Sequence, residues 1–332
     1  MTSAPRFAVV AIGNAIVDVL ARADDALITA EGLTKGSMRL IDTAEAEHLY
    51  AAMGPAMEMS GGSAANTLAG MAMLGHDCGF IGQVASDQLG QVFTHDLRAI
   101  GVTYDTPALN HGAPTARCLI LVTPDGQRTM NTFLGASHLL STEMIDEAMI
   151  AAADILYLEG YLWDPELSRA AMRRAIAVAR NAGAKVAFTL SDAFIIDRHG
   201  ADFRALIAAG QFDILFANET EICALAQSDD FDASVAAIAP QVPLLVVTRG
   251  EHGAIAVQNG VTTSVSAEPI AQVVDTTGAG DLFAAGFLSG LAKGQSMEQC
   301  LTSGAVCAGA IIAQFGPRSQ VDLKALVAAR LT

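Results

Sequence analysis

Two glycines and an acid end the stretch Asp275-Thr-Thr-Gly-Ala-Gly-Asp281, and an apolar run from Leu282 to Leu288 follows directly. A glycine-rich turn can point its backbone N–H groups outward, and the apolar run is typical of a helix. Because exposed amides and the helix dipole attract phosphate, the stretch predicts an anion site at a helix N-terminus. Asp281 would lie beside the anion and could act as a general base. The same acid could instead simply cap the helix.

Two common nucleotide-binding patterns are missing from the sequence. It contains no G-x-x-x-x-G-K-[ST], and no G-x-G-x-x-G follows its first apolar run, from Phe7 to Ile12. An enzyme with this sequence that handles phosphate must therefore use the later glycine-rich turn.

Other polar residues have an ordinary structural explanation when only the local sequence is considered. Asn14 and Asp18, just beyond the first strand, fit a turn Asn and a solvated acid. Gly61 and Gly62 fit a tight turn before the helical run from residue 67 to 74.

Asn218 and Glu221 lie at i and i+3, hence on one face of a helix start, where they fit a capping box. Thr248 ends a predicted strand, and with Gly250 it fits a plain turn.

The composition is that of a folded protein with a large acidic excess. The 332 residues are 52% hydrophobic and 16% charged, which allows a substantial core and argues against disorder. The 35 acids and 19 bases give a net charge of -16, so nucleic acids and anionic membranes are poor partners.

Cysteine and histidine usage favours a cytoplasmic protein without a zinc site. The five cysteines are widely spaced and form no CxxC, which predicts reduced thiols, and no HExxH occurs. The uncharged stretch from Gln299 to Pro317 contains several small polar residues and predicts a buried helix. We expect no signal peptide, because Asn14 and Asp18 interrupt the N-terminal apolar run.

Strands and helices alternate from about residue 140 onward, which predicts a mostly parallel sheet covered on both faces. Residues 15–45 and 105–133 instead alternate apolar and polar residues between turn signals, and predict half-exposed strands of a small β lid inserted in one α/β domain spanning residues 1–332. The expected strands are 155–158, 185–190, 214–216 and 243–248, and the expected helices are 165–181, 201–209, 219–226 and one near 233.

Four segments resemble motifs of the ribokinase (PfkB) family of carbohydrate kinases, in that family's order and at its spacing. Asp275 to Leu288 and Gly61 to Gly75 are similar to its two signature segments. Asn218-Glu-Thr-Glu221 resembles its N-x-x-E motif, and Thr248-Arg-Gly-Glu-His-Gly253 resembles its T-x-G-x-x-G stretch.

Within that family the sequence is most similar to adenosine kinases and their bacterial relatives. The similarity lies in Gly13-Asn-Ala-Ile-Val-Asp18, Gly126-Gln-Arg-Thr-Met-Asn131 and Tyr157-Leu-Glu-Gly-Tyr161. The resemblance implies a ribokinase-like fold, a three-layer α/β/α sandwich with a mostly parallel central sheet and a β lid. It also implies ATP-dependent phosphorylation of a ribonucleoside 5′-hydroxyl, with adenosine converted to AMP.

The same resemblance assigns the residues of the phosphoryl transfer. Asp281 would take the proton from the attacking hydroxyl, while the amides of Gly278, Ala279 and Gly280 would hold the migrating group, since preorganised donors stabilise developing charge. Arg128 would move onto the phosphates with the lid, although an exposed arginine without a task fits equally well.

The acceptor-binding residues implied by the resemblance lie in the first half of the chain. Asp18 would bind two sugar hydroxyls, because a carboxylate offers two acceptor oxygens. Tyr161 would lie near the purine, although a buried aromatic can equally be part of the core. The full set is Asn14, Asp18, Gly61, Gly62, Asn66 and Tyr161.

For ATP the resemblance implies Asn218, Thr248, Gly250 and Gly253, and for Mg²⁺ it implies Asn218 and Glu221 acting largely through water. K⁺ is a further candidate ligand. It would bind at Asp275, Thr277 and Gly316, with backbone carbonyls supplying most of the contacts.

Two alternatives remain open. Gly61-Gly-Ser-Ala-Ala-Asn66 is the generic sugar-kinase form, so the acceptor could be a free sugar such as ribose, fructose or a keto-deoxy sugar acid. The chain could also be a non-catalytic sensor on a kinase scaffold, although Asp281, its glycines and the N-x-x-E motif occur together. Either a monomer or a homodimer is compatible with the sequence.

Overall fold

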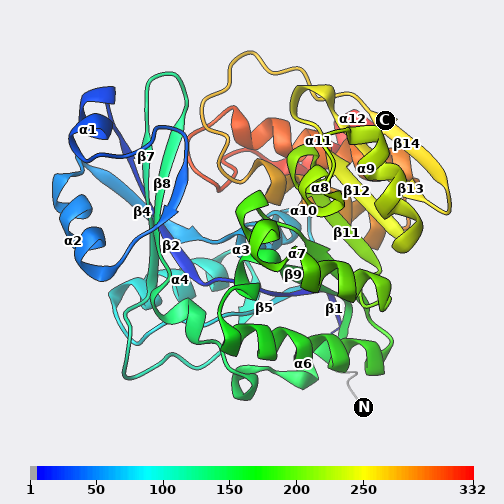
Figure 1. The fold of residues 1–332 in the computed structure, drawn as a ribbon, viewed down its shortest axis with the longest axis horizontal. Coiled ribbons are helices and arrows are strands. Elements are labelled where there is room, and N and C mark those ends of the chain that lie inside the picture. Colours follow the sequence, from blue (N-terminus) through cyan, green and yellow to red (C-terminus); the bar gives the residue numbers. More distant parts are fainter. Residues whose placement is uncertain (1–5) are drawn as a thin grey trace.

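A nine-stranded sheet runs through the centre of the molecule in the computed structural model, which describes residues 6–332 (Figure 1). Its strands lie in the order β14-β13-β12-β11-β10-β9-β1-β5-β6, parallel from β12 to β6, with β13 and β14 antiparallel at one edge. The strands are β1 (Phe7–Ile12), β5 (Cys78–Ile81), β6 (Val102–Tyr104), β9 (Ala153–Glu159), β10 (Lys185–Thr189), β11 (Ile214–Asn218), β12 (Leu244–Thr248), β13 (Ala254–Gln258) and β14 (Val261–Val265).

Helices cover both faces of this sheet, because its strands are apolar on both sides. Alternate residues of β1 separate accordingly: Val9 and Ala11 join one hydrophobic core, whereas Val10 and Ile12 join the other. The first face carries α3 (Ser63–Met73), α4 (Gln88–Ala99), α10 (Ala279–Ala292), α11 (Met297–Ile312) and α12 (Leu323–Leu331), and the second carries α5 (Glu147–Ala151), α6 (Glu166–Ala182), α7 (Ala193–Ala208), α8 (Glu219–Ala226) and α9 (Phe231–Ile238). The molecule is thus an α/β/α sandwich with a mostly parallel sheet, as expected.

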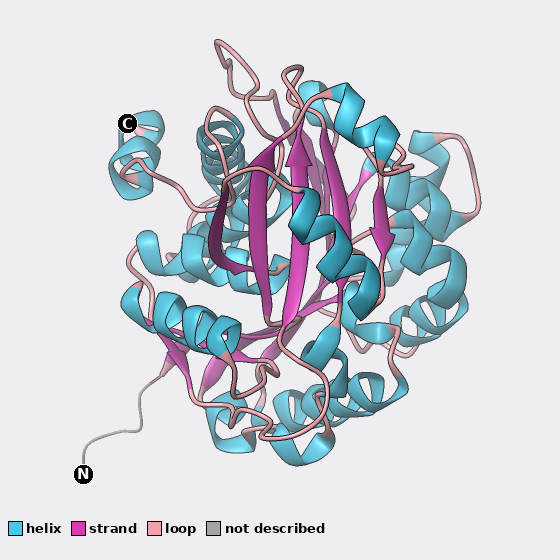
Figure 2. Cartoon of the chain, turned by 90° about the vertical axis from the view of Figure 1, so that its left-hand side faces the viewer, coloured by secondary structure: helices cyan, strands magenta, loops and turns pink. Residues whose placement is uncertain are grey.

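A second, five-stranded sheet lies beside the large one, on the left of Figure 1, in the order β3-β8-β7-β2-β4. Viewed from that side, helices lie against its strands (Figure 2). Its elements are β2 (Ile16–Arg22), β3 (Met38–Leu40), β4 (Ala56–Gly61), β7 (Ala116–Val122) and β8 (Arg128–Phe133), accompanied by α1 (Asp25–Ala30) and α2 (Thr43–Ala52).

Two expectations about this smaller sheet need correction. It includes β4, which lies outside both predicted stretches, because β4 pairs along the whole of β2. Its central strands are also not half-exposed: β2 is buried except at Arg22. Val17 and Val19 face a helix-covered core, whereas Ile16 and Leu20 form part of a separate apolar cluster on the opposite face.

Most elements predicted in the second half of the chain are confirmed. The helix predicted from 201 is longer, however: α7 begins at Ala193, where the Asp192 side chain accepts a hydrogen bond from the Phe194 N–H and caps the helix. All five cysteines are free, as expected. No helix among residues 6–332 is both long and apolar enough to cross a membrane. The uncharged stretch from Gln299 lies in α11 as far as Ile312, and its last five residues follow the helix.

Close packing of α10 on α11 gives a test of the fold. A Cβ atom added at Gly286 would lie 2.3 Å from the Ser303 carbonyl oxygen, which belongs to helix backbone and cannot swing away. We expect Gly286→Ala to lower the free energy of unfolding by about 1–3 kcal/mol, measured by urea denaturation. Gly280→Ala in the same helix is the matched control, because its Cβ would meet no atom within 4 Å. Equal stabilities of the two variants would contradict this packing.

Candidate active site

A cavity of about 350 Å³ lies between the two sheets, at the carboxyl ends of the parallel strands. Asn14 follows β1, Glu159 ends β9, Asn218 ends β11 and Thr248 ends β12, and all four line the cavity. Ligands of open α/β sheets bind at this edge. The strand order therefore gathers polar residues that are far apart in the sequence.

The predicted glycine-rich turn forms part of the cavity wall. Gly278 has a left-handed backbone (φ +77°) and is the N-cap of α10, with no side chain bonded to the first amides of the helix. Gly278, Ala279, Gly280 and Asp281 all line the cavity. The turn is neither sealed in the core nor remote from a cleft. The Ala279 N–H donates to the Thr276 carbonyl oxygen at 3.3 Å, whereas among residues 6–332 the N–H groups of Gly278 and Gly280 have no backbone partner and remain available for an anion.

Asp275 holds this turn in place. Its buried carboxylate accepts hydrogen bonds from the Thr277 N–H (2.9 Å) and hydroxyl (2.6 Å), and from the Gly316 N–H (3.0 Å). The three residues proposed for K⁺ thus lie together. Both oxygens of Asp275 are already used to tie the turn to the segment that follows α11.

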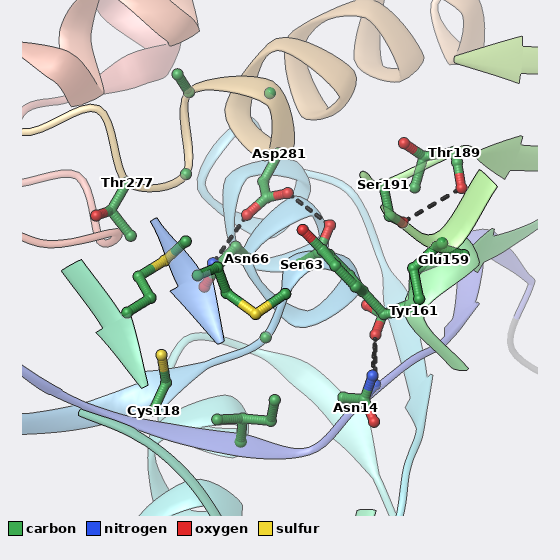
Figure 3. Close-up of a pocket in the computed structure, with 18 of the residues that line it drawn as sticks. Asn14, Ser63, Asn66, Cys118, Glu159, Tyr161, Thr189, Ser191, Thr277 and Asp281 are labelled. Carbon is green, nitrogen blue, oxygen red and sulfur yellow. Dashed lines mark hydrogen bonds between the residues drawn. The ribbon is translucent and has the colours of Figure 1, made fainter. Parts of the chain in front are cut away.

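Asp281 does not cap its own helix. Its two carboxylate oxygens accept hydrogen bonds from α3, from the Ser63 hydroxyl (2.6 Å) and from Asn66 Nδ2 (2.9 Å), as Figure 3 shows. Burial raises the pKa of Asp281, and these two hydrogen bonds oppose the rise. The capping interpretation is wrong, and the carboxylate is fixed at the cavity beside the glycine-rich turn.

Asp18 lies in β2 on the row that faces the cavity, between Ile16 and Leu20, and it is only 5% exposed. The local interpretation as a solvated acid is therefore wrong. Burial raises the pKa of Asp18 to about 7, and the nearby Arg318 guanidinium opposes this rise. A Cβ atom at Gly61 would lie 2.2 Å from the Asp18 carboxyl carbon, so glycine at this position leaves room for the acid.

Glu159 joins the end of β1 to the start of α3. It is fully buried and accepts hydrogen bonds of 2.8 Å from the Asn14 N–H, from Asn14 Nδ2 and from the Ala64 N–H. Burial raises its pKa to about 7, against these three donors. Gly62 (φ +88°) completes the turn, because a Cβ atom there would lie 2.2 Å from the Asn14 carbonyl oxygen. The glycine pair is thus the tight turn that brings α3 to the cavity.

Asn218 and Glu221 form the expected capping box. The Asn218 side chain accepts from the Glu221 N–H (2.8 Å), and Glu221 accepts from Asn218 N (3.1 Å) and Nδ2 (2.6 Å). Glu221 is nevertheless a cavity residue, 5% exposed, and burial and the neighbouring Asp192 carboxylate raise its pKa to about 7. Asp192 caps α7 and does not itself line the cavity.

Some of the remaining predicted residues line the cavity, and others lie outside it. Arg128, at the start of β8, and Tyr161, which packs against Phe194 with ring centroids 6.2 Å apart, both line the cavity. Gly253 does not: its φ is +84°, and a Cβ atom would meet the Val265 carbonyl oxygen at 2.0 Å, so the backbone requires glycine. Gly250 lies in the short helical turn Gly250–His252 with open space around it.

Sequence reasoning missed three residues. Ser63 lies inside the quoted Gly61–Asn66 stretch, and Glu159 inside the Tyr157–Tyr161 stretch, at the end of a predicted strand. Arg318 donates to Asn66 and to Ser60, and its only signal is that it is the first charge after the uncharged stretch ending at Pro317.

The raised pKa of Asp18 gives a pH-dependent prediction. The folded protein holds a proton on Asp18 up to about pH 7, whereas the unfolded chain releases it near pH 4. The bound proton therefore stabilises the folded state fully below pH 4, and this contribution to the free energy of unfolding is lost as pH rises through 7. Asp18→Asn mimics the protonated acid. We expect it to raise the free energy of unfolding by roughly 1–3 kcal/mol at pH 8, with little effect at pH 4.

Thermal or urea unfolding at both pH values measures this difference, and Asp229→Asn, at an exposed acid, is the control. A stabilisation by Asp18→Asn that is the same at pH 4 and pH 8 would contradict the assignment.

Comparisons with known proteins show the family of this chain. The family model of pfkB family carbohydrate kinases matches residues 38–324. The solved adenosine kinase from Sinorhizobium meliloti is 46% identical with a TM-score of 0.94, over 98% of this chain and 99% of that one. A probable sugar kinase from Rhizobium etli CFN 42 is 45% identical with a TM-score of 0.94, over 98% of both chains. A fructokinase from Klebsiella pneumoniae is 31% identical over 243 residues, 72% of this chain and 79% of that enzyme. The chain belongs to the pfkB family of carbohydrate kinases.

Proposed function

We propose that this kinase transfers the γ-phosphoryl group of ATP to the 5′-hydroxyl of a ribonucleoside, with adenosine as the acceptor and AMP as the product. The acceptor would lie between the two sheets, with its sugar at Asp18 and Asn14 and its reacting hydroxyl at Asp281.

The observation that carries this proposal is the apolar surface around Asp18. The cavity-facing side chains of the smaller sheet are mostly large and apolar, and they suit the flat face of a nucleobase, which a free sugar lacks. They are Ile16, Met38, Leu40, Ile120 and Met130. The 46% identity to an adenosine kinase points the same way.

The chemistry follows from the contacts of Asp281. Ser63 and Asn66 orient its carboxylate toward the cavity, where it would accept the proton of the attacking hydroxyl. The N–H groups of residues 278–280 would hold the transferring group, and one such donor is worth roughly 3–4 kcal/mol in other enzymes. Arg128 would add positive charge from the smaller sheet, which would act as a lid that excludes water.

Residues at the other end of the cavity suit the nucleotide and its metal ion. Among residues 6–332, no three His, Cys, Asp or Glu side chains form a metal cage, which is compatible with Mg²⁺ held through water. Glu221, with Asp192 beside it and Asn218 on it, offers the negative charge that such an ion requires. Mg²⁺ bound with ATP would neutralise charge on the phosphates. Thr248 and the Gly250 turn would border the nucleotide.

A K⁺ ion would depend on backbone carbonyls near Asp275, Thr277 and Gly316, because Asp275 uses both oxygens within the protein. We also place the enzyme in the cytoplasm, as a monomer or homodimer.

A kinase of a free sugar is the alternative, and the 31% identity to a fructokinase favours it. The two proposed functions differ in whether the apolar surface of the smaller sheet contacts the acceptor.

An acceptor panel separates these functions. We expect ATP-dependent ADP formation with adenosine, and thermal stabilisation by adenosine above that by inosine, ribose, fructose or 2-keto-3-deoxygluconate. Met130→Ala should raise the KM for adenosine and leave the KM for ATP unchanged, because Met130 lies on the acceptor surface. Selective stabilisation and turnover with a bare sugar would replace adenosine by that sugar, and a lack of turnover with every acceptor would favour a sensor.

Asp281→Asn tests the general base. The amide can keep both contacts to α3, its oxygen accepting from Asn66 Nδ2 and its nitrogen donating to the Ser63 hydroxyl oxygen. It cannot take a proton, so we expect kcat to fall by at least about 10²-fold with little change in ligand affinity. Ser63→Ala is the matched control, because it removes one hydrogen bond and leaves the carboxylate, and its loss should be far smaller. Full turnover by Asp281→Asn would require a different base.

A further inference from the structure

Arg318 connects three parts of the site, although it does not itself line the cavity. It lies between α11 and α12, and its side chain reaches back across the molecule. Nη1 donates to Asn66 Oδ1 at 2.6 Å, and Nη2 donates to Ser60 Oγ at 2.9 Å. It thereby joins the segment after α11 to α3 and to β4 of the smaller sheet.

The contact with Asn66 decides which way the amide of Asn66 faces. A guanidinium has only donors, so Asn66 must turn its oxygen to Arg318. The other end of the same amide, Nδ2, then faces Asp281 Oδ2 at 2.9 Å. Without Arg318 the amide could rotate by half a turn and present an oxygen to the carboxylate, which would repel it.

Arg318 is also surrounded by acids. Burial lowers its pKa to about 10, while Asp18, Asp281 and Asp96 oppose this change, so the guanidinium stays charged at neutral pH. Three other charged groups act on the carboxylates of Asp18 and Asp281 from neighbouring elements. They are Arg128 on β8, Asp275 before α10 and Glu159 on β9.

We propose that Arg318 is a positioning residue, which orients the Asn66 amide toward Asp281 and so aims this carboxylate at the acceptor hydroxyl. The inference rests on the proposed kinase function, but it concerns a residue which that function does not itself require. Ser60 supplies the second anchor of the guanidinium.

The test compares Arg318→Met, which retains the length of the side chain without its donors, with Ser60→Ala, which removes only the second anchor. Assays use the full chain with ATP and adenosine, or fructose if the panel selects it. We expect Arg318→Met to lower kcat about tenfold or more with an unchanged KM for ATP, and Ser60→Ala to stay within about twofold of wild type.

The pH profile supplies a readout that a purely structural role would not move. Loss of the positive charge and of the Asn66 orientation disfavours the ionised form of Asp281, so the acidic limb of kcat should shift to higher pH in Arg318→Met. An unshifted limb together with unchanged kcat would overturn the inference.

A double-mutant cycle with Asn66→Ala shows whether Arg318 acts through Asn66. Arg318→Met should lower kcat several-fold less in the Asn66→Ala background than in wild type. Equal losses in both backgrounds would overturn the inference. If Arg318→Met does not fold, the same double-mutant cycle is made with Arg318→Lys.

Wild-type protein that phosphorylates no acceptor would overturn the proposed function and this inference together. An active wild type with an unaffected Arg318 variant would overturn the inference alone.

Discussion

The carboxylate of Asp281 is held at the N-terminus of α10 by two donors from α3, and the rest of the site is arranged around this contact. It requires the two helices to pack closely, and Gly70 allows this, since a Cβ atom there would lie 2.6 Å from Ala285 Cβ. It also requires the turn before α10 to keep its shape, which Asp275 ensures. Asp281, which forms no salt bridge among residues 6–332, is then left partly buried beside the glycine-rich turn.

Acids removed from water are the main electrostatic feature of the cavity. Asp18, Glu159 and Glu221 are buried and Asp281 is partly buried, and burial raises the pKa of each. Such groups are stabilised by specific donors or by ligands that bring positive charge or hydroxyl groups. All three of Asp18, Glu159 and Glu221 line the cavity, but Glu159 and Glu221 accept hydrogen bonds within the protein, whereas Asp18 accepts none among residues 6–332. Asp18 is therefore the acid whose oxygens are left for a ligand.

Local sequence predicted the features that are set by neighbouring residues. The glycine turn before α10, the capping box at Asn218 and most strands of the large sheet follow from spacing and residue type alone. Asp18 was harder to interpret, because its burial depends on β4 and β7 pairing on either side of β2. Arg318 gave almost no signal, since its contact with Asn66 joins residues 252 positions apart.

A structure of the enzyme with ADP, aluminium fluoride and the acceptor tests the central claim most directly. The account predicts that the fluoride group contacts the N–H groups of residues 278–280, and that the acceptor oxygen lies within about 2.6–3.2 Å of an Asp281 carboxylate oxygen. A fluoride group bound away from this turn, or an acceptor hydroxyl out of reach of Asp281, would contradict it.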